Sequence, residues 1–171
     1  MKSDETTSSE VQSRIPLRYV SLAFFIAAEI SHRGPLPNDG LQECAIFDGR
    51  WIDTTNPIVP IAEAMPAMLW IGDPDGRCVY LNKAQRDFWG VEIGEVPRFT
   101  WSSTLWPDDQ EKLYAVFSVA MERREPFTVE ARYRRADGAI RVLQTRAEPR
   151  FAPNGTFMGM VGVNTDVTPQ D

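Results

Sequence analysis

The chain has 171 residues, of which 43% are hydrophobic and 25% charged, and these values are typical of a soluble globular protein. This composition argues against a fully disordered, collagen-like or coiled-coil chain, and the length suits one domain of about 100–150 residues plus an extension. Eighteen basic against 24 acidic residues give a net charge of −6, which argues against a nucleic-acid partner. Cys44, Cys78 and His32 are the only cysteines and histidine, too few for a structural zinc site or a disulfide framework.

The first 60 residues divide into a polar tail and an extension. Residues 1–14 are rich in Ser and Thr and have almost nothing to bury, so we expect them to be disordered. Residues 15–60 form the extension. Within it, a helix is predicted over 16–32, where Pro16 suits a first turn. A short hairpin is suggested over 43–55, around a tight turn.

The predicted helix 16–32 has apolar residues around most of its circumference, so it needs cover from another surface. It either packs against the main domain or forms a homodimer, and in the second case Val20, Phe24 and Phe25 are the interface candidates. Its apolar run, 19–28, is shorter than the roughly 18 residues of a membrane span. Acidic residues precede this run where a signal peptide would be basic, so we expect a cytoplasmic protein.

From residue 61 onward the pattern is more regular. The predicted strands are, in chain order, MLWI, CVYLN, FTVEARYRR, AIRVLQTRAEPRF and TFMGMVGVNTDVT. The predicted helices are KAQRDFWG, which Gly90 ends, and PDDQEKLYAVFSVAMERRE, which opens with Pro107 at its first turn. Long strands joined by glycine turns, with helical stretches before them, predict an α+β domain whose sheet buries one face under the helices.

These segments resemble, in family order, the PAS sensor fold with its PAC-type second half. MPAMLWIGDPDGRCVYLNKAQRDFWG resembles the opening two strands and short helix, and LWPDDQEKL resembles the start of the long helix, with Trp106 where the family usually has histidine. EARYRRADGAIRVLQTRAEP resembles the strand-turn-strand, and GTFMGMVGVNTDVT resembles the last strand. The resemblance covers residues 61–169. This segment is similar to the sensor domains of bacterial histidine kinases and cyclic-dinucleotide enzymes. It implies a five-stranded antiparallel sheet of order 2-1-5-4-3 with helices over one face.

In this family, small molecules bind between the helices and the inner face of the sheet. Strand alternation, placed in the family's register, makes six residues the pocket candidates: Met68, Trp70, Tyr133, Leu143, Met160 and Asn164. The alternative is a filled core without a ligand, because Trp, Leu, Met and Tyr are core residues by default.

The resemblance also bears on the cofactor, whose identity is unknown. The segment that carries the adduct-forming cysteine of light-oxygen-voltage sensors reads VPRFTWSSTLW here and has no cysteine, which argues against a covalent flavin. Residues 107–125 contain no histidine, which argues against histidine-ligated haem, and Cys78 is not at the position that holds the photoactive-yellow chromophore. A non-covalent flavin, a fatty acid or another apolar ligand stays open.

The sequence favours a non-catalytic sensory or regulatory module of bacterial two-component signalling. In the family, an Asp-x-Thr at the end of the last strand leads to a signalling helix, and Asp166 and Thr168 match it. The chain stops at Asp171, so we expect a fragment of a longer protein or a chain that acts through a histidine kinase or other output partner. A ligand-free dimerisation or docking scaffold is the alternative. The sequence shows no nucleophile with a base, no phosphate loop and no metal cluster, so no enzyme is expected.

Overall fold

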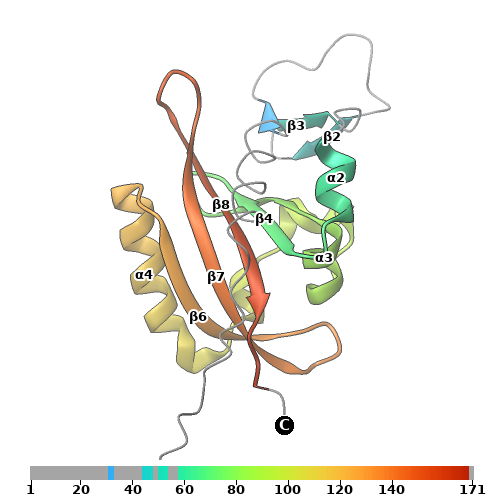
Figure 1. The fold of residues 1–171 in the computed structure, drawn as a ribbon, viewed down its shortest axis with the longest axis vertical. Coiled ribbons are helices and arrows are strands. Elements are labelled where there is room, and N and C mark those ends of the chain that lie inside the picture. The colour runs from blue at the N-terminus through green and yellow to red at the C-terminus, as the bar shows by residue number, and fades with distance from the viewer. Residues whose placement is uncertain (1–30, 33–43, 48–49, 54–57, 170–171) are drawn as a thin grey trace, which may run out of the picture.

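The computed structural model describes residues 31–32, 44–47, 50–53 and 58–169. Within the last range, five strands form one antiparallel sheet in the order β5-β4-β8-β7-β6 (Figure 1). The strands are β4 (Met68–Gly72), β5 (Cys78–Leu81), β6 (Phe127–Arg134), β7 (Ile140–Phe151) and β8 (Phe157–Asp166). Counted from β4, this order is 2-1-5-4-3, so the predicted topology is confirmed.

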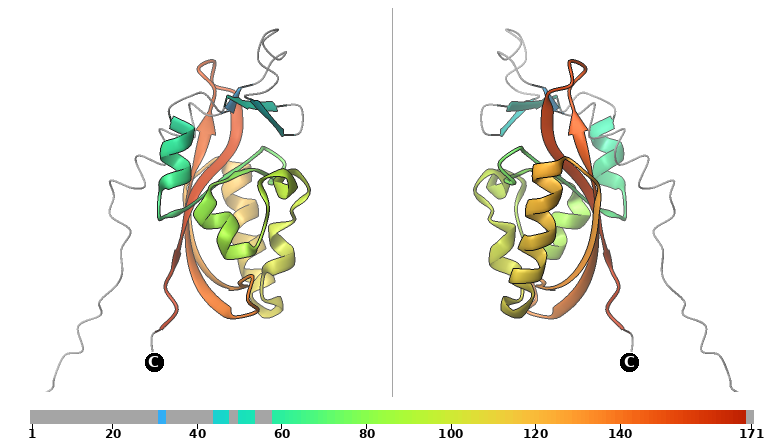
Figure 2. Two further views of the ribbon diagram at one scale, coloured as in Figure 1. Left: turned by 90° about the vertical axis from the view of Figure 1, so that its right-hand side faces the viewer. Right: turned by 90° about the vertical axis from the view of Figure 1, so that its left-hand side faces the viewer.

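Helices cover both faces of the sheet. Figure 2 shows α2 (Ile58–Ala64) on one face, and α3 (Lys83–Trp89) and α4 (Gln110–Arg123) on the other. We call the face under α3 and α4 the inner face, and the opposite one the outer face. The irregular stretch between α3 and α4 consists of three 3-10 turns, which are η1 (Ile93–Arg98), η2 (Trp101–Thr104) and η3 (Pro107–Asp109). The sequence analysis did not anticipate α2, whose Pro60 lies in the first turn, where proline is tolerated.

The helix α3 begins and ends where its sequence dictates. Asn82 caps it, because the side-chain Oδ1 accepts a hydrogen bond from the backbone N–H of Gln85 at 3.1 Å. Gly90 ends it in the left-handed conformation, at a φ of 68°, which glycine adopts without steric cost. This short helix therefore has a fixed place against the sheet.

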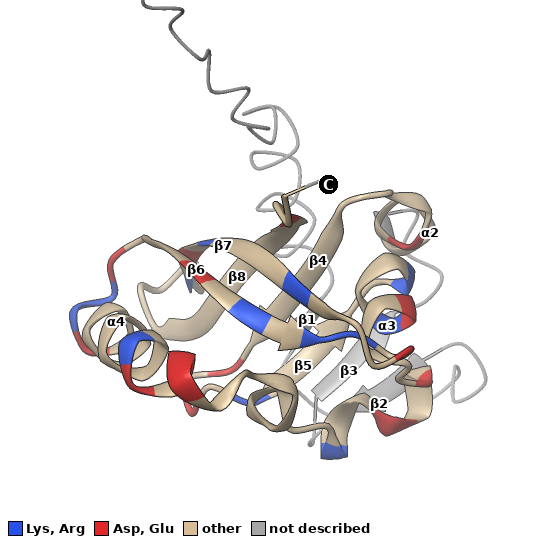
Figure 3. Ribbon diagram, turned by 90° about the horizontal axis from the view of Figure 1, so that it is seen from below, with Lys and Arg blue, Asp and Glu red and all other residues tan. Residues whose placement is uncertain are grey.

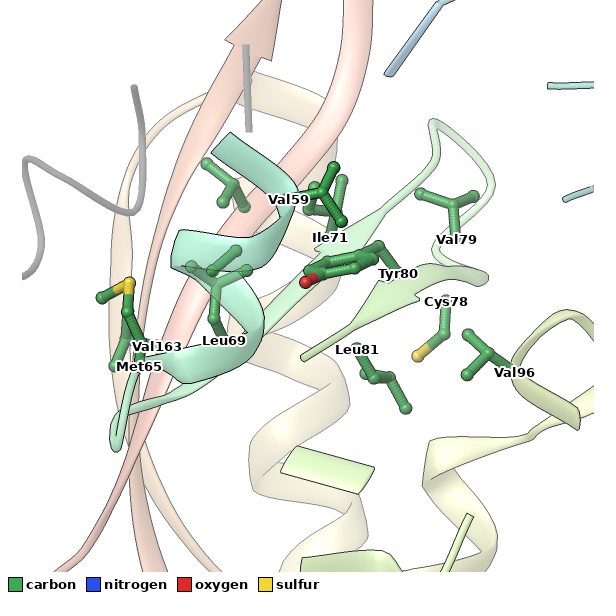
Figure 4. Packing of buried hydrophobic residues seen from close by; sticks show 12 residues of the cluster. Val59, Met65, Leu69, Ile71, Cys78, Val79, Tyr80, Leu81, Val96 and Val163 are labelled. Carbon is green, nitrogen blue, oxygen red and sulfur yellow. The ribbon is translucent and has the colours of Figure 1, made fainter. Parts of the chain in front are cut away.

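The outer face is packed tightly under α2. Leu69, Ile71 and Val163 are fully buried there and belong to one cluster with Val59 and Ala62 of the helix (Figure 4). Charged residues occur along β6 and β7 (Figure 3), and two of them on β6, Glu130 and Arg134, are exposed. Burial of the apolar cluster thus accounts for the position of α2 on the outer face.

Three short strands precede the domain. β2 (Cys44–Phe47) and β3 (Arg50–Asp53) pair antiparallel inside the segment 43–55, where the sequence suggested a hairpin. β1 (Ser31–His32) pairs with β3, so the predicted helix 16–32 is wrong at its last two residues. The backbone groups of Ser31 and His32 pair with β3 instead of continuing a helical turn. The tail 1–14, the remainder of that helix and its interface candidates lie outside the described residues; those candidates are Val20, Phe24 and Phe25.

Candidate functional site

A cavity of about 50 Å³ lies between the inner face of the sheet and its helical cover. One water needs roughly 10–15 Å³ of such space, so the cavity has room for about three to five waters. It therefore suits a compact ligand of a few heavy atoms better than a flavin or a haem. Aromatic residues from several elements line it, namely Trp70, Trp89, Trp101, Phe117, Phe127 and Tyr133.

The structure brings together four of the six pocket candidates. Trp70, Tyr133, Met160 and Asn164 line the cavity. Leu143 does not, because it is fully buried within the inner-face cluster that includes Val129 and Ala131. Met68 is half-buried and packs against the same cluster, away from the cavity. Both residues lie on the face that the strand alternation predicted, so sheet position alone did not tell lining residues from core residues.

The aromatic rings around the cavity are steeply inclined to one another. The Trp101 and Phe117 rings are 5.7 Å apart at 64°, and the Phe117 and Phe127 rings are 6.0 Å apart at 88°. Trp89 and Tyr133 are 6.2 Å apart at 56°. The first two pairs are edge-to-face and the third is tilted, and such inclined ring pairs are favourable.

Trp70 reaches the cavity because its cross-strand neighbour is a glycine. Trp70 on β4 pairs with Gly162 on β8, and a Cβ on Gly162 would lie 2.5 Å from two carbons of the Trp70 indole. No real side chain tolerates that distance, so the indole lies directly on the backbone of β8. The absence of a side chain at Gly162 therefore gives the Trp70 indole its place beside the cavity.

A buried chain of hydrogen bonds crosses the inner face. The Thr145 hydroxyl donates to Asn164 Oδ1 at 2.7 Å, and Asn164 Nδ2 donates to Gln85 Oε1 at 2.7 Å. Burial raises the pKa of the Tyr133 hydroxyl, while a hydrogen bond with Thr145 acts in the opposite direction. These contacts connect β6, β7 and β8 with α3, and three of the residues that make them, Tyr133, Thr145 and Asn164, line the cavity.

One end of the cavity carries a buried carboxylate. Asp73 is 3% exposed, and its Oδ1 accepts hydrogen bonds from the backbone N–H groups of Asp75 and Arg77, each at 2.9 Å. This is the Asx geometry of a tight turn. Cys78 lies nearby; burial, together with the charge of Asp73, raises the pKa of its thiol to about 12. The thiol is therefore protonated at neutral pH.

Sequence reasoning gave no role to Asp73, Asn82 or Gln85. Asn82 is fully buried; its Oδ1 accepts from the Leu69 N–H at 2.9 Å, and its Nδ2 donates to the Ala62 carbonyl at 3.0 Å. An asparagine before a helical pattern is a recognised N-cap signal, and it was available here. The contacts of Gln85 and the burial of Asp73 depend on tertiary packing and had no local signal.

The predicted exit motif closes the end of β8. Asp166 Oδ1 accepts hydrogen bonds from both the N–H and the hydroxyl of Thr168, at 3.0 Å and 2.6 Å. The Thr168 hydroxyl oxygen accepts from the Val142 N–H at 2.8 Å, and the Val167 N–H donates to the Val142 carbonyl at 2.8 Å. The motif therefore holds the chain against β7 as it leaves the sheet.

Within the described residues, no group of His, Cys, Asp and Glu side chains could hold a metal ion. No helix in that part of the chain is long and apolar enough to cross a membrane. The sequence model of the PAS fold matches residues 78–164, just over half of the chain. The chain belongs to the PAS family. PAS domains are generally non-catalytic sensor modules of signalling proteins.

Known proteins similar to this PAS chain agree on the fold. An uncharacterised protein of Sinorhizobium fredii, y4lL, is 32% identical over 108 residues; the match takes in 63% of this chain and 13% of that protein. The PAS domain of a Colwellia psychrerythraea protein has a TM-score of 0.58 at 21% identity, covering 68% of this chain and 98% of its own. A Rhodobacter sphaeroides LOV protein has a TM-score of 0.56 at 14% sequence identity, and the match covers 63% of each chain. VqmA bound to DPO has a TM-score of 0.55 at 16% sequence identity, and the match covers 64% of this chain and 56% of the VqmA chain.

Proposed function

We propose that this chain is a non-catalytic sensory module of bacterial signal transduction that binds a small molecule in the inner-face cavity. Binding is relayed through the end of β8. The observation that carries the proposal is the composition of that strand: Met160 and Asn164 line the cavity, and Asp166, two residues after Asn164, forms the exit turn. One strand therefore contains both the ligand contacts and the outlet.

Asn164 is the residue through which binding is converted into a shift of β8. It has hydrogen bonds on both sides, to Thr145 on β7 and to Gln85 on α3. A ligand that competes for either bond changes the balance between two packings of β8 against β7 and α3. The next inward position on β8 is Asp166, which pairs with Leu143 of β7.

The output passes to a histidine kinase or another output domain, within a longer polypeptide or in a partner protein. The motif of Asp166 and Thr168 holds the chain against β7 and so fixes the direction in which it leaves β8, which is what a following helix needs. We also propose a cytoplasmic homodimer as the working form.

Ligand binding by this fold has a precedent. VqmA, whose fold is similar, is known with a bound ligand, DPO, which supports the proposal that the cavity binds a small molecule.

Native mass spectrometry of the full chain tests the proposal. We expect a native mass above the denatured mass, and loss of that difference in Met160→Phe, which fills the cavity. Val119→Phe, at a 47% exposed position of α4, adds a ring outside the cavity and keeps the bound mass. Hydrogen exchange should differ between the ligand-bound and ligand-free chain at 164–168. A chain that never carries a ligand would instead be the docking scaffold.

A further inference from the structure

We propose that the cavity binds a compact organic cation of the tetramethylammonium type, in preference to a neutral apolar molecule or a flat ring system. This inference rests on the proposed function, because it names the class of ligand for the same cavity. It follows from three features of the lining: its aromatic residues, its single buried charge and its size.

The aromatic lining suits a cation. Six aromatic residues surround the cavity, and three of them are tryptophans, Trp70, Trp89 and Trp101. The face of an aromatic ring attracts a positive charge, tryptophan most strongly, and cages of such rings recognise quaternary ammonium groups. The rings of Trp101, Phe117 and Phe127 are inclined steeply to one another instead of stacking in parallel, which suits a nitrogen with four methyl groups better than a planar ligand.

The charge of the residues that line the cavity also favours a cation. Asp73 supplies a carboxylate that is 3% exposed, and it forms no ion pair with any residue that the structure describes. The turn N–H groups hydrogen-bond to Oδ1 alone, while Oδ2 accepts no hydrogen bond from the described residues. Among the residues that the structure describes, no Lys, Arg or His lines the cavity. A buried charge calls for a counter-charge, so a cation gains from Asp73 and an anion is repelled by it.

The size of the cavity limits the size of the ligand. The space is about 50 Å³, enough for about three to five waters and hence for a ligand of a few heavy atoms. Tetramethylammonium is of that size, and tert-butanol is its uncharged counterpart with the same number of heavy atoms. The two probes therefore separate charge from shape.

Isothermal titration calorimetry on the full chain provides the test, with tetramethylammonium chloride, tert-butanol and sodium chloride as titrants. We expect tetramethylammonium to bind at least tenfold more tightly than tert-butanol, and sodium chloride to give no binding signal. Asp73→Asn keeps the Oδ1 acceptor of the turn and removes the charge, so it should weaken tetramethylammonium binding at least tenfold and leave tert-butanol binding unchanged. Asp75→Asn is the matched control, because its side chain is 71% exposed.

A second variant keeps the test decisive should Asp73→Asn fail to fold, which circular dichroism reports. Phe117→Leu keeps the apolar volume and removes one ring, and it should weaken tetramethylammonium binding more than tert-butanol binding. Equal affinity for both probes would overturn the cation inference and leave the sensory proposal standing. So would a failure of both probes in a chain that purifies with another bound mass. Failure of both probes together with no bound mass would overturn both proposals.

Discussion

The two faces of β4 have opposite character, although their residues alternate along one strand. Leu69 and Ile71 point to the outer face and are 0% exposed, in a cluster closed by α2. Trp70, between them in sequence, points to the inner face, is half-buried and borders a cavity. One strand can therefore contribute to a dense core on one side and border a cavity on the other. The dense face stabilises the fold, while the inner face keeps space in which side chains can repack around a ligand.

Truncating neighbouring residues on the two faces should give the largest contrast. Leu69→Ala removes a fully buried side chain from the dense face, and we expect a loss of about 3–5 kcal/mol in the free energy of unfolding. Trp70→Ala removes a larger side chain that is only half-buried beside an existing cavity, so we expect a smaller loss, about 2 kcal/mol. Urea denaturation followed by circular dichroism measures both. An equal or larger loss at Trp70 would show that the inner face is a filled core.

Asn82 joins the two faces, and its loss should have the next largest effect. Its side chain holds the Ala62 carbonyl of α2 on one side and caps α3 through the Gln85 N–H on the other. Asn82→Ala leaves several buried groups without partners, so we expect a loss of about 2–4 kcal/mol. Asn154→Ala is the matched control, because Asn154 makes one exposed turn contact, with the Thr156 N–H, and should lose less than about 0.5 kcal/mol. Similar losses for both variants would contradict this role of Asn82.

Gly162→Ala tests how closely Trp70 lies on β8. The added methyl would meet the indole at 2.5 Å, so we expect a loss of about 1–3 kcal/mol from overpacking. Combining it with Trp70→Ala should remove most of that loss, because the clash no longer exists. Gly94→Ala has open space around it and serves as the control. Full additivity of the two changes in urea denaturation would mean that the indole lies elsewhere.

The fold was predictable because its signals are local and repeat along the chain. Alternation in FTVEARYRR, the glycine turns and Pro107 at a helix start each indicate one element, and the resemblance supplied the order of the strands. The faces of the strands followed from the same alternation, which placed Tyr133 and Asn164 inward. One residue of shift would have reversed every face, so the register was decisive.

The cavity was only partly predictable, for a physical reason. Alternation separates the faces but says nothing about depth, so Leu143 and Met68 were grouped with residues that line the cavity. The burial of Asp73 had no local signal in the sequence, because it depends on tertiary packing. At Ser31 and His32 the helical pattern did not hold, since pairing with a distant strand overrides local propensity.

Cys78 pairs with Gly72 of β4 and lines the cavity on the inner face, and its reactivity gives the smallest and most local test of the contrast between the faces. It is buried, and burial with the nearby Asp73 charge raises the pKa of its thiol to about 12. A thiol with a raised folded-state pKa stays protonated, so its contribution to stability is present at neutral pH and is lost as the pH rises above the ordinary thiol value, about 8.5. In a Cys44→Ser background, the rate of iodoacetamide labelling should be far below that of the urea-unfolded chain at pH 8. It should keep rising through pH 10, because the thiolate fraction has not saturated. A labelling rate that levels off near pH 9 would mean that water reaches Cys78 from the cavity side, and the inner face would then be open to solvent at this position.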